Sequence, residues 1–192
     1  MKTFPKLQNL FGMATALCAF ALAAQESQSL VPAFVKEGRD FTNNGQEGHK
    51  LKGWLPKDWV DNSEWAQVNA TYSKLDDPPK EGVIAVRIQV EKVDDGQLQL
   101  TCFQKRTYKK GVKYVVEGWV RSKGGAGLNV GIRQLGEPYE FYAEQPLEGA
   151  AEWKRFTFEF SFSEDREGIV MFYKPETGTV DLAGVVVREK KD

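Results

Sequence analysis

A tryptophan lies between two opposite charges in one predicted strand of this sequence. The stretch YVVEGWVRS, residues 114–122, alternates with the period of a β-strand and places Glu117, Trp119 and Arg121 on one face. A solvated sheet face normally carries small polar and charged side chains, and a buried face excludes charge, so this mixture fits neither type. An aromatic ring flanked by hydrogen-bonding side chains suits a surface that holds a polar ligand.

The other predicted strands carry similar side chains in their outward phase. Alternation continues in VIAVRIQV (residues 83–90), which buries its apolar positions and exposes Arg87 and Gln89. It recurs in GQLQLTCFQ (96–104) and in AGLNVGIRQ (126–134). We therefore predict one outer face that holds the ligand, formed by Trp119, Glu117, Arg121, Arg87, Gln89, Gln99, Phe103, Asn129 and Arg133.

Three further aromatic residues are candidates for ligand contact: Tyr139 and Tyr142 at the rim of this face, and Trp59, for which plugging the end of the sandwich is the alternative. Tyr139 and Tyr142 belong to the turn-rich stretch GEPYEFYAE, where ordinary packing is the alternative to ligand contact. Trp59 lies in residues 39–82, a long segment that holds three of the five tryptophans. Loops of this length usually carry function or wrap a core. Trp153 precedes a run of phenylalanines and is predicted to be a core aromatic.

A purely structural interpretation of Trp119 stays open. Its ring would then lie beneath the segment 39–82, while Glu117 and Arg121 would form cross-strand ion pairs with their neighbours. The two interpretations differ in whether these side chains are free to meet a ligand.

The cysteine and the histidine of the predicted mature chain offer no catalytic or metal site. Cys102 shares its phase with Leu98 and Leu100, which predicts a buried, inert thiol rather than a nucleophile. It is alone after cleavage, so no intrachain disulfide can form. His49 is the only histidine and is predicted to lie in a loop, because no matching acid or nucleophile is near it in the sequence.

The N-terminus has the layout of a secretory signal peptide. Two lysines precede a short apolar run and a small-residue cleavage site, which predicts a signal peptide over residues 1–23, a polar lead-in over 24–29 and one domain over 30–192. Removing the two lysines leaves 26 − 2 = 24 basic against 27 acidic groups. This slightly acidic balance indicates neither a nucleic-acid nor an anionic-membrane partner. We expect a secreted or periplasmic monomer without a membrane span.

The remaining pattern is typical of an all-β fold. No segment shows an apolar stripe of helical period, and short alternating stretches follow one another with glycine turns between them. The first strand is predicted at LVPAFVKE (residues 30–37), and KRFTFEFSF (154–162) sets four phenylalanines on one side. We predict a β-sandwich jelly roll of two antiparallel sheets.

The order of these pieces resembles the carbohydrate-binding modules of the family 4 and 9 group. The resemblance covers nearly all of Leu30 to Arg188 and rests on LVPAFVKE, Gly53-Trp54, GVIAVRI, KKGVKYVVEGWVRS, LNVGIRQLGEPYEFY, EWKRFTFEF and GTVDLAGVVV in that order. Modules of this group are jelly rolls that bind sugar chains in the groove of a concave sheet or at the rim. The resemblance thus implies a non-catalytic protein with a carbohydrate ligand.

Two departures from the group concern a structural calcium ion. The group commonly starts with an Asn-Gly-Asp-Phe-Glu-like motif, which PAFVKEGRDF matches in character but not in spacing. Its last strand tends to carry Asp-Asp, where this chain has Ala183-Gly184. Calcium needs six or more oxygens, several of them from carboxylates. We therefore expect no cofactor and no metal at the ligand site, and the loss of the acidic pair puts the structural calcium ion of the group in doubt for this chain.

Two other function classes compete with a carbohydrate-binding module. Polysaccharide lyases and glycosidases also use β-sandwiches, but the Glu-x-Asp-x-x-Glu strand of the sandwich glycosidases is absent, and TYKKGVKY lacks the His and Arg partners of a lyase strand. A structural or protein-binding module of a cell surface is the remaining alternative, because a fold does not fix a function.

Overall fold

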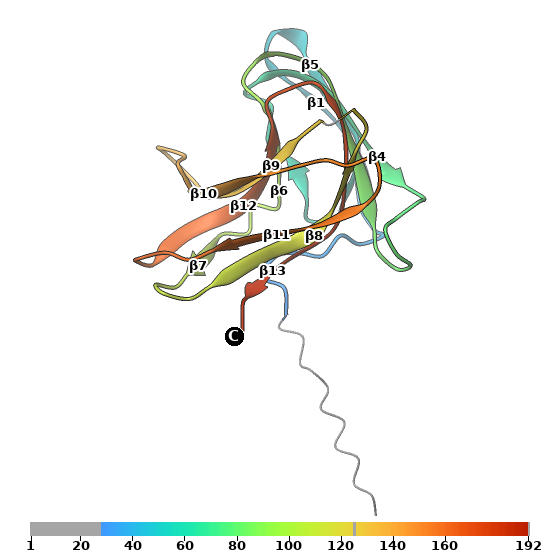
Figure 1. The fold of residues 1–192 in the computed structure, drawn as a ribbon. Helices are drawn as coiled ribbons and strands as arrows, with labels where there is room; N and C mark the ends of the chain where they lie inside the picture. The colour runs from blue at the N-terminus through green and yellow to red at the C-terminus, as the bar shows by residue number, and fades with distance from the viewer. Residues whose placement is uncertain (1–27, 125, 192) are drawn as a thin grey trace, which may run out of the picture.

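The protein forms two sheets packed face to face, as predicted (Figure 1). The computed structural model describes residues 28–124 and 126–191, so the predicted signal peptide lies outside the described residues. The seven-stranded sheet has the order β1 (Gly38–Asn44), β2 (Lys50–Pro56), β4 (Gln67–Leu75), β5 (Ala85–Asp95), β13 (Gly178–Glu189), β8 (Tyr114–Ser122) and β11 (Lys154–Phe160). The six-stranded sheet has the order β10 (Phe141–Leu147), β9 (Leu128–Arg133), β12 (Arg166–Lys174), β6 (Leu98–Thr101) and β3 (Val60–Asp61), with β7 (Arg106–Tyr108) paired to β12.

Pairing is antiparallel throughout the described sheets except between β2 and β4, which run parallel. A single turn of 3₁₀-helix, η1 (Gln46–Gly48), joins β1 to β2. Within the described residues, no helix has the length and hydropathy needed to cross a membrane.

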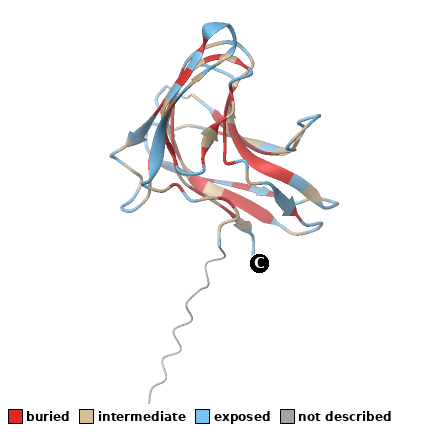
Figure 2. Cartoon of the chain, turned by 180° about the vertical axis from the view of Figure 1, so that it is seen from behind, coloured by how far each residue is buried: buried red, intermediate tan, exposed pale blue. Residues whose placement is uncertain are grey.

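The core between the sheets follows the alternation that the sequence predicts. Buried residues recur along the strands of both sheets (Figure 2), and their apolar side chains form one core layer. Phe156, Phe158 and Phe160 of β11 point into this layer, as predicted from the phenylalanine run. Burial of large aromatic side chains in a closely packed interior supplies most of the stabilisation of such a sandwich.

The first 50 residues of the domain differ from the prediction. Residues 30–37 form no strand, since Pro32 lacks a backbone N–H and this segment instead runs beside β13, where Leu30 N donates to Val187 O at 2.6 Å. The segment 39–82 is not a long loop but contains β1, η1, β2, β3 and β4. The alternation of Val68, Ala70 and Tyr72 in β4 was present in the sequence and was missed.

Cys102 lies inward, as its phase predicts, with 7% of its surface exposed. Burial is the main cause that raises the pKa of its thiol. Because the thiolate is the reactive form, we expect slow modification by a thiol reagent in the native protein and fast modification after denaturation. Spectrophotometric labelling with and without denaturant measures both rates, and equal rates would contradict the burial.

Candidate functional site

The predicted single site is divided between two opposite surfaces. Glu117, Trp119, Arg121, Arg87 and Gln89 lie on the outer face of the seven-stranded sheet, because β5 and β8 belong to it. Gln99, Asn129 and Arg133 lie on the outer face of the six-stranded sheet. The prediction of one shared face is therefore wrong, since alternation distinguishes inside from outside but not one sheet from the other.

The outer face of the six-stranded sheet carries a row of polar groups around an aromatic pair. Gln99 of β6, Tyr173 of β12 and Asn129 of β9 are direct neighbours across three strands. The ring of Phe141 in β10 lies 4.9 Å from that of Tyr173. The Tyr173 hydroxyl donates to Glu144 Oε2 at 2.6 Å. The pKa of Tyr173 is raised, mainly by desolvation and secondly by the neighbouring Glu144 carboxylate. We call these five residues the aromatic-amide row.

A glycine allows the aromatic pair to lie close to the sheet. A Cβ atom on Gly131 would come within 2.6 Å of the Phe141 ring, so any larger residue would push the ring away. Thr101 and Met171, in the row beside it, are fully buried although they point outward. The surface beside the aromatic-amide row is thus closely packed.

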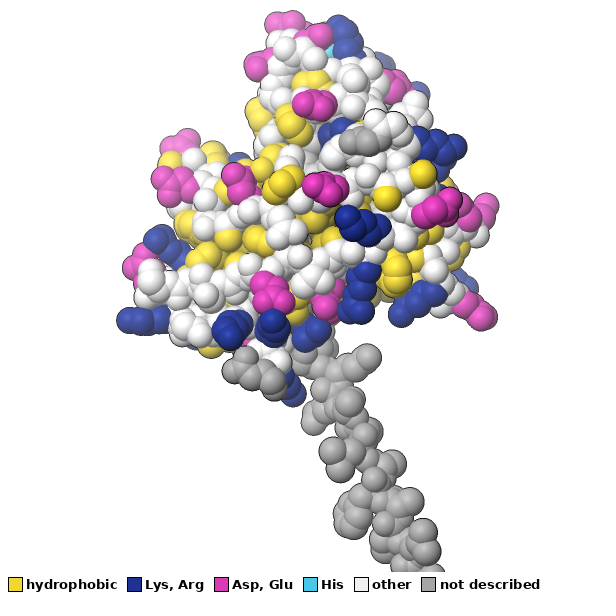
Figure 3. All heavy atoms as spheres, viewed as in Figure 1, with side chains coloured by type: hydrophobic (Ala, Val, Ile, Leu, Met, Phe, Trp, Pro, Cys, Tyr) yellow, Lys and Arg dark blue, Asp and Glu magenta, His cyan; other side chains and the backbone are white. Residues whose placement is uncertain are grey.

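The turn between β9 and β10 forms one side of this face. The guanidinium of Arg133 lies 4.6 Å from the ring centroid of Tyr139, and its Nε donates to Tyr139 O at 3.3 Å. Tyr139 is 48% exposed with a φ of 60°. In Figure 3 the surface dips between the lobe of this turn on the left and the lobe at the top of the molecule. Hydrophobic atoms show on the slope between them.

The opposite side of the face, at the β3 edge, is also hollowed. A cavity of about 520 Å³ lies between the outer edge of β1 and the residues Val60, Glu64 and Phe103. Phe103 is 44% exposed and has a φ of 48°. Val60 pairs with Thr101 and so shares the outer face, which places Phe103 near the same surface as the aromatic-amide row.

Gln99 is only 2% exposed and is held by a largely buried polar cluster. Asn62 Nδ2 donates to Gln99 Oε1 at 2.8 Å, and Ser63 Oγ accepts from Gln99 N at 2.7 Å. Asp61 accepts hydrogen bonds from Ser63 and from the Tyr72 hydroxyl of the other sheet. Burial raises the pKa of Asp61 to about 6, against the lowering effect of these hydrogen bonds. The cluster fixes β3 and Gln99 relative to both sheets.

Trp59 is buried, and Tyr142 is not at the rim as predicted. Trp59 is 1% exposed, and its Nε1 donates to Pro32 O at 3.0 Å, so it is a core residue and the assignment to the ligand site is wrong. Tyr142 occupies a bulge of β10, packs against Phe162 and lies under the Arg166 guanidinium at 4.8 Å. Its contacts match the alternative of ordinary packing.

The outer face of the seven-stranded sheet is cross-linked by charge. Asp181 is 3% exposed and accepts from Arg87 at 2.8 and 3.0 Å and from Arg121 at 2.9 and 2.7 Å. Arg121 also pairs with Asp77 at 2.7 Å and stacks at 4.6 Å over Trp153. Trp153 therefore lies on this outer face, and its assignment to the core is wrong.

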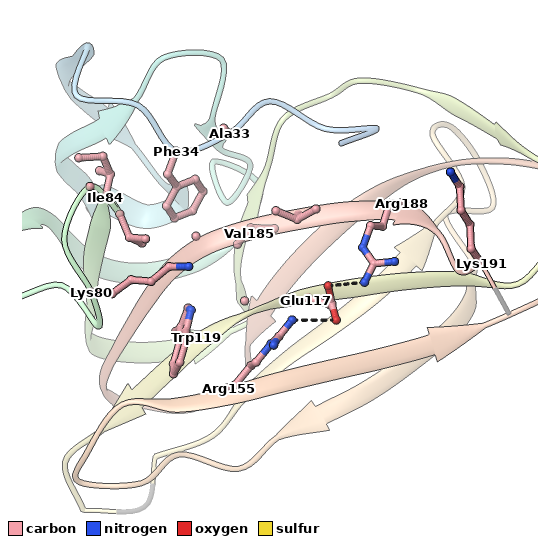
Figure 4. Close-up of a pocket in the computed structure, with 15 residues that line it drawn as sticks. Ala33, Phe34, Lys80, Ile84, Glu117, Trp119, Arg155, Val185, Arg188 and Lys191 are labelled. Carbon is pink, nitrogen blue, oxygen red and sulfur yellow. Dashed lines mark hydrogen bonds and ion pairs between the residues drawn. The ribbon is translucent and has the colours of Figure 1, made fainter. Parts of the chain in front are cut away.

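The Glu117–Trp119 part of this face combines an ion-pair cluster with a pocket. Glu117 accepts from Arg155 at 3.1 Å and from Arg188 at 2.9 Å, as the structural interpretation predicts (Figure 4). Trp119 is half-buried and lines a pocket of about 700 Å³ that also holds Lys80. Gln89 is exposed elsewhere on the same sheet.

Several residues of the six-stranded face were missed in the sequence. Tyr173 lies in GIVMFYK, where both phases are apolar, so no alternation marks it as outward. Phe141 and Glu144 are separated by the β10 bulge, which breaks the period of two. Asn62 meets Gln99 only through pairing of segments 37 residues apart.

His49 has an acidic neighbour in space that lies far from it in the sequence. His49 is 7% exposed, and its Nε2 lies 2.9 Å from Asp94 Oδ2, an acid 45 residues further along the chain. His49 lies in the loop between η1 and β2, as predicted, but the expectation that it has no acidic partner is wrong. Within residues 28–124 and 126–191, no group of three or more His, Cys, Asp or Glu side chains converges on a common metal position.

Comparison with known proteins identifies the relatives of this chain. A solved structure described as "CBM4 structure and function" superimposes with a TM-score of 0.57 at 16% identity, over 84% of this chain and all of the other. Another, "BiXyn10A CBM1 APO", does so with a TM-score of 0.50 at 19% identity, over 85% and 99%. These likenesses establish the fold. No curated protein sequence matches the chain. The family CBM_4_9, described as a carbohydrate binding domain, matches residues 41–179, and the chain belongs to this family.

Proposed function

We propose that this protein is an exported, non-catalytic module that binds a polysaccharide across the outer face of its six-stranded sheet. The observation that carries the proposal is the aromatic-amide row, in which Tyr173 lies between Asn129 and the buried Gln99 and packs against Phe141. Membership of a carbohydrate-binding family supports the ligand class.

The chemistry of this row is complementary to a sugar chain. A sugar ring has weakly polar C–H faces and a rim of hydroxyl groups, so it is best held by a flat aromatic surface with amides at its edge. Amide groups both donate and accept hydrogen bonds, as hydroxyls do, which favours a neutral sugar at this position. The dips on both sides, at Tyr139 and at Phe103, would let a chain extend beyond one ring.

Binding rather than hydrolysis is supported by the placement of acids. A glycosidase needs two carboxylates that face each other across the scissile bond. In the aromatic-amide row Glu144 is the one carboxylate, and it already accepts the Tyr173 hydroxyl. This row therefore offers a surface for holding sugar and no acid–base pair.

We expect Tyr173→Ala to weaken polysaccharide binding roughly 5- to 150-fold, the range that corresponds to about 1–3 kcal/mol of lost aromatic stacking, taken from aromatic–base stacking. Phe141→Ala should act similarly. Affinity electrophoresis in gels that contain soluble β-glucan, xylan or mannan measures the effect, with the exposed Glu159→Ala as a control on the other sheet.

The result depends first on the parent protein, which should be retarded by at least one of these polysaccharides. If both aromatic variants are retarded as strongly as the parent protein, the binding site does not lie on this face. Release of reducing ends or unsaturated products during incubation would contradict the non-catalytic assignment, and binding to none of the polysaccharides would favour a structural or protein-binding module.

A further inference from the structure

The pocket beside Trp119 lies on the outer face of the seven-stranded sheet, on the other side of the sandwich from the aromatic-amide row. It exists because β13 stays paired with β5 only as far as Ala183 and then bulges before Val186. Gly184, at the bulge, has a φ of 57°, a conformation that favours glycine. A Cβ atom there would come within 3.1 Å of Val83, at the pocket wall.

The walls of the pocket are aromatic and aliphatic. Phe34 from the N-terminal segment, Ile84 from the start of β5 and Val185 from β13 surround the opening, and Trp119 rises from β8 (Figure 4). Its volume of about 700 Å³ falls within the range of about 300–1,000 Å³ that is usual for small-molecule sites. A ring-sized ligand can therefore be enclosed against an indole.

Hydrogen-bond donors greatly exceed free acceptors in this pocket. The Lys80 side chain extends over Trp119, with its amino group directed into the opening (Figure 4). Across the described residues, neither Lys80 Nζ nor Trp119 Nε1 has a hydrogen-bond or ion-pair partner. The carboxylate of Glu117 accepts from two arginines at once, so its oxygens are already occupied.

The charge of the lining has one sign. Lys80, Arg155, Arg188 and Lys191 contribute four positive charges and Glu117 one negative charge, a formal sum of +3. Arg155 is 60% and Arg188 31% exposed at the side chain, so both can turn part of their guanidinium toward a ligand. Such a lining opposes a calcium ion and favours an anion.

We infer that this pocket binds an acidic sugar of the uronate class, with the ring against Trp119 and the carboxylate toward Lys80 and Arg188. The flat indole of Trp119 is suited to stack against a sugar ring. The excess of cationic donors is suited to a carboxylate, which accepts charge-assisted hydrogen bonds. This site is independent of the neutral-sugar face and adds a second specificity to the module.

The test uses isothermal titration of the full mature chain with galacturonate and glucuronate, and with galactose and glucose as neutral counterparts. We expect at least one uronate to bind roughly 10-fold or more tightly than its neutral counterpart, the ratio that one charge-assisted hydrogen bond supplies. Higher salt should lower the affinity for the uronate and leave the affinity for the neutral sugar unchanged. A neutral sugar that binds as tightly as its uronate would overturn the inference.

Substitution locates the site. Lys80→Met, in an exposed loop, should lower uronate affinity roughly 10-fold, and Trp119→Ala should lower it as well, while Lys52→Met on β2 serves as the charge-matched control. An equal loss of uronate affinity in Lys52→Met would indicate nonspecific charge attraction and overturn the inference. Since Lys80→Met removes an exposed side chain, its binding result stands even if Trp119→Ala folds poorly.

Two further probes test whether the pocket takes a single uronate ring and whether the two sites bind independently. An oligogalacturonate should bind at least as tightly as the monomer, and binding of the oligomer alone would contradict a ring-sized pocket. A neutral polysaccharide held on the opposite face should leave uronate affinity unchanged. Competition between the two would place both ligands in one site and overturn the inference.

Discussion

Trp59→Ala is expected to lower the free energy of unfolding by about 3–5 kcal/mol, the usual cost of truncating a buried tryptophan. Its indole is 1% exposed, meets Phe34 edge-to-face at 4.8 Å and lies 6.2 Å from Phe172. Its N–H also holds Pro32 O, so the truncation creates a cavity and frees a carbonyl in the N-terminal segment. Urea denaturation followed by circular dichroism measures the loss.

Matched substitutions separate the two parts of this effect. Trp59→Phe keeps most of the ring volume and removes the hydrogen bond, so it should cost about 1 kcal/mol for the bond plus a smaller packing loss. Trp65→Ala makes the same truncation at a residue that is 50% exposed and should cost much less. Equal losses at Trp59 and Trp65 would show that Trp59 is not the core residue described above.

The in-or-out phase of most strands could be predicted because it depends only on local alternation. The buried positions of β5, β8 and β11 and the inward thiol of Cys102 all follow from a period of two. Segments with a local irregularity were not predictable in the same way. β2 carries Gly53 at a φ of 122° and pairs in parallel with β4, so its pattern does not resemble an antiparallel strand.

The candidate site was harder to predict because it depends on which strands become neighbours. β8 lies between β13 and β11, and β9 lies between β10 and β12, so Trp119 and Asn129 face opposite directions although they are only ten positions apart. Asp181 joins Arg87 and Arg121 across 94 and 60 residues, and no local pattern reveals that these guanidinium groups are already engaged. Sequence spacing alone therefore assigned the ion-paired residues of the seven-stranded sheet and residues of the aromatic-amide row to one site.

The two outer faces also differ in what they leave available. On the seven-stranded sheet, Arg87, Arg121 and Glu117 are bound to partners, and these ion pairs link β5, β13, β8 and β11. On the six-stranded sheet, the rings of Phe141 and Tyr173 and the Asn129 amide are partly exposed and stay available to a ligand, whereas Gln99 is 2% exposed and already accepts from Asn62. The first arrangement supports the shape of the sandwich, and the second is suited to binding on it.

Asp61 makes the stability of the sandwich depend on pH in the weakly acidic range. Burial raises its pKa from 3.8 to about 6, so the folded protein holds a proton that the unfolded chain releases at lower pH. Between about pH 4 and pH 6 the unfolded state therefore binds fewer protons, and the free energy of unfolding falls as the pH rises. The difference of 6 − 3.8 = 2.2 corresponds to a loss on the order of 2–3 kcal/mol, complete above about pH 6.

We expect Asp61→Asn to remove this dependence, because an amide of the same shape does not ionise, its oxygen can still accept from the Ser63 N–H, and its NH2 group can donate to the Tyr72 hydroxyl oxygen. Urea denaturation of both proteins at pH 4 and pH 7 measures the change, with the parent losing on the order of 2–3 kcal/mol relative to the variant. Acids elsewhere cancel in this difference because both proteins share them. Asp165→Asn is the opposite control: Asp165 is exposed and the Lys109 amino group lowers its pKa, so that variant alters the curve below about pH 4. Parallel curves for the parent and Asp61→Asn would mean that Asp61 is already ionised in the folded protein, with the Tyr72 and Ser63 hydrogen bonds outweighing its burial.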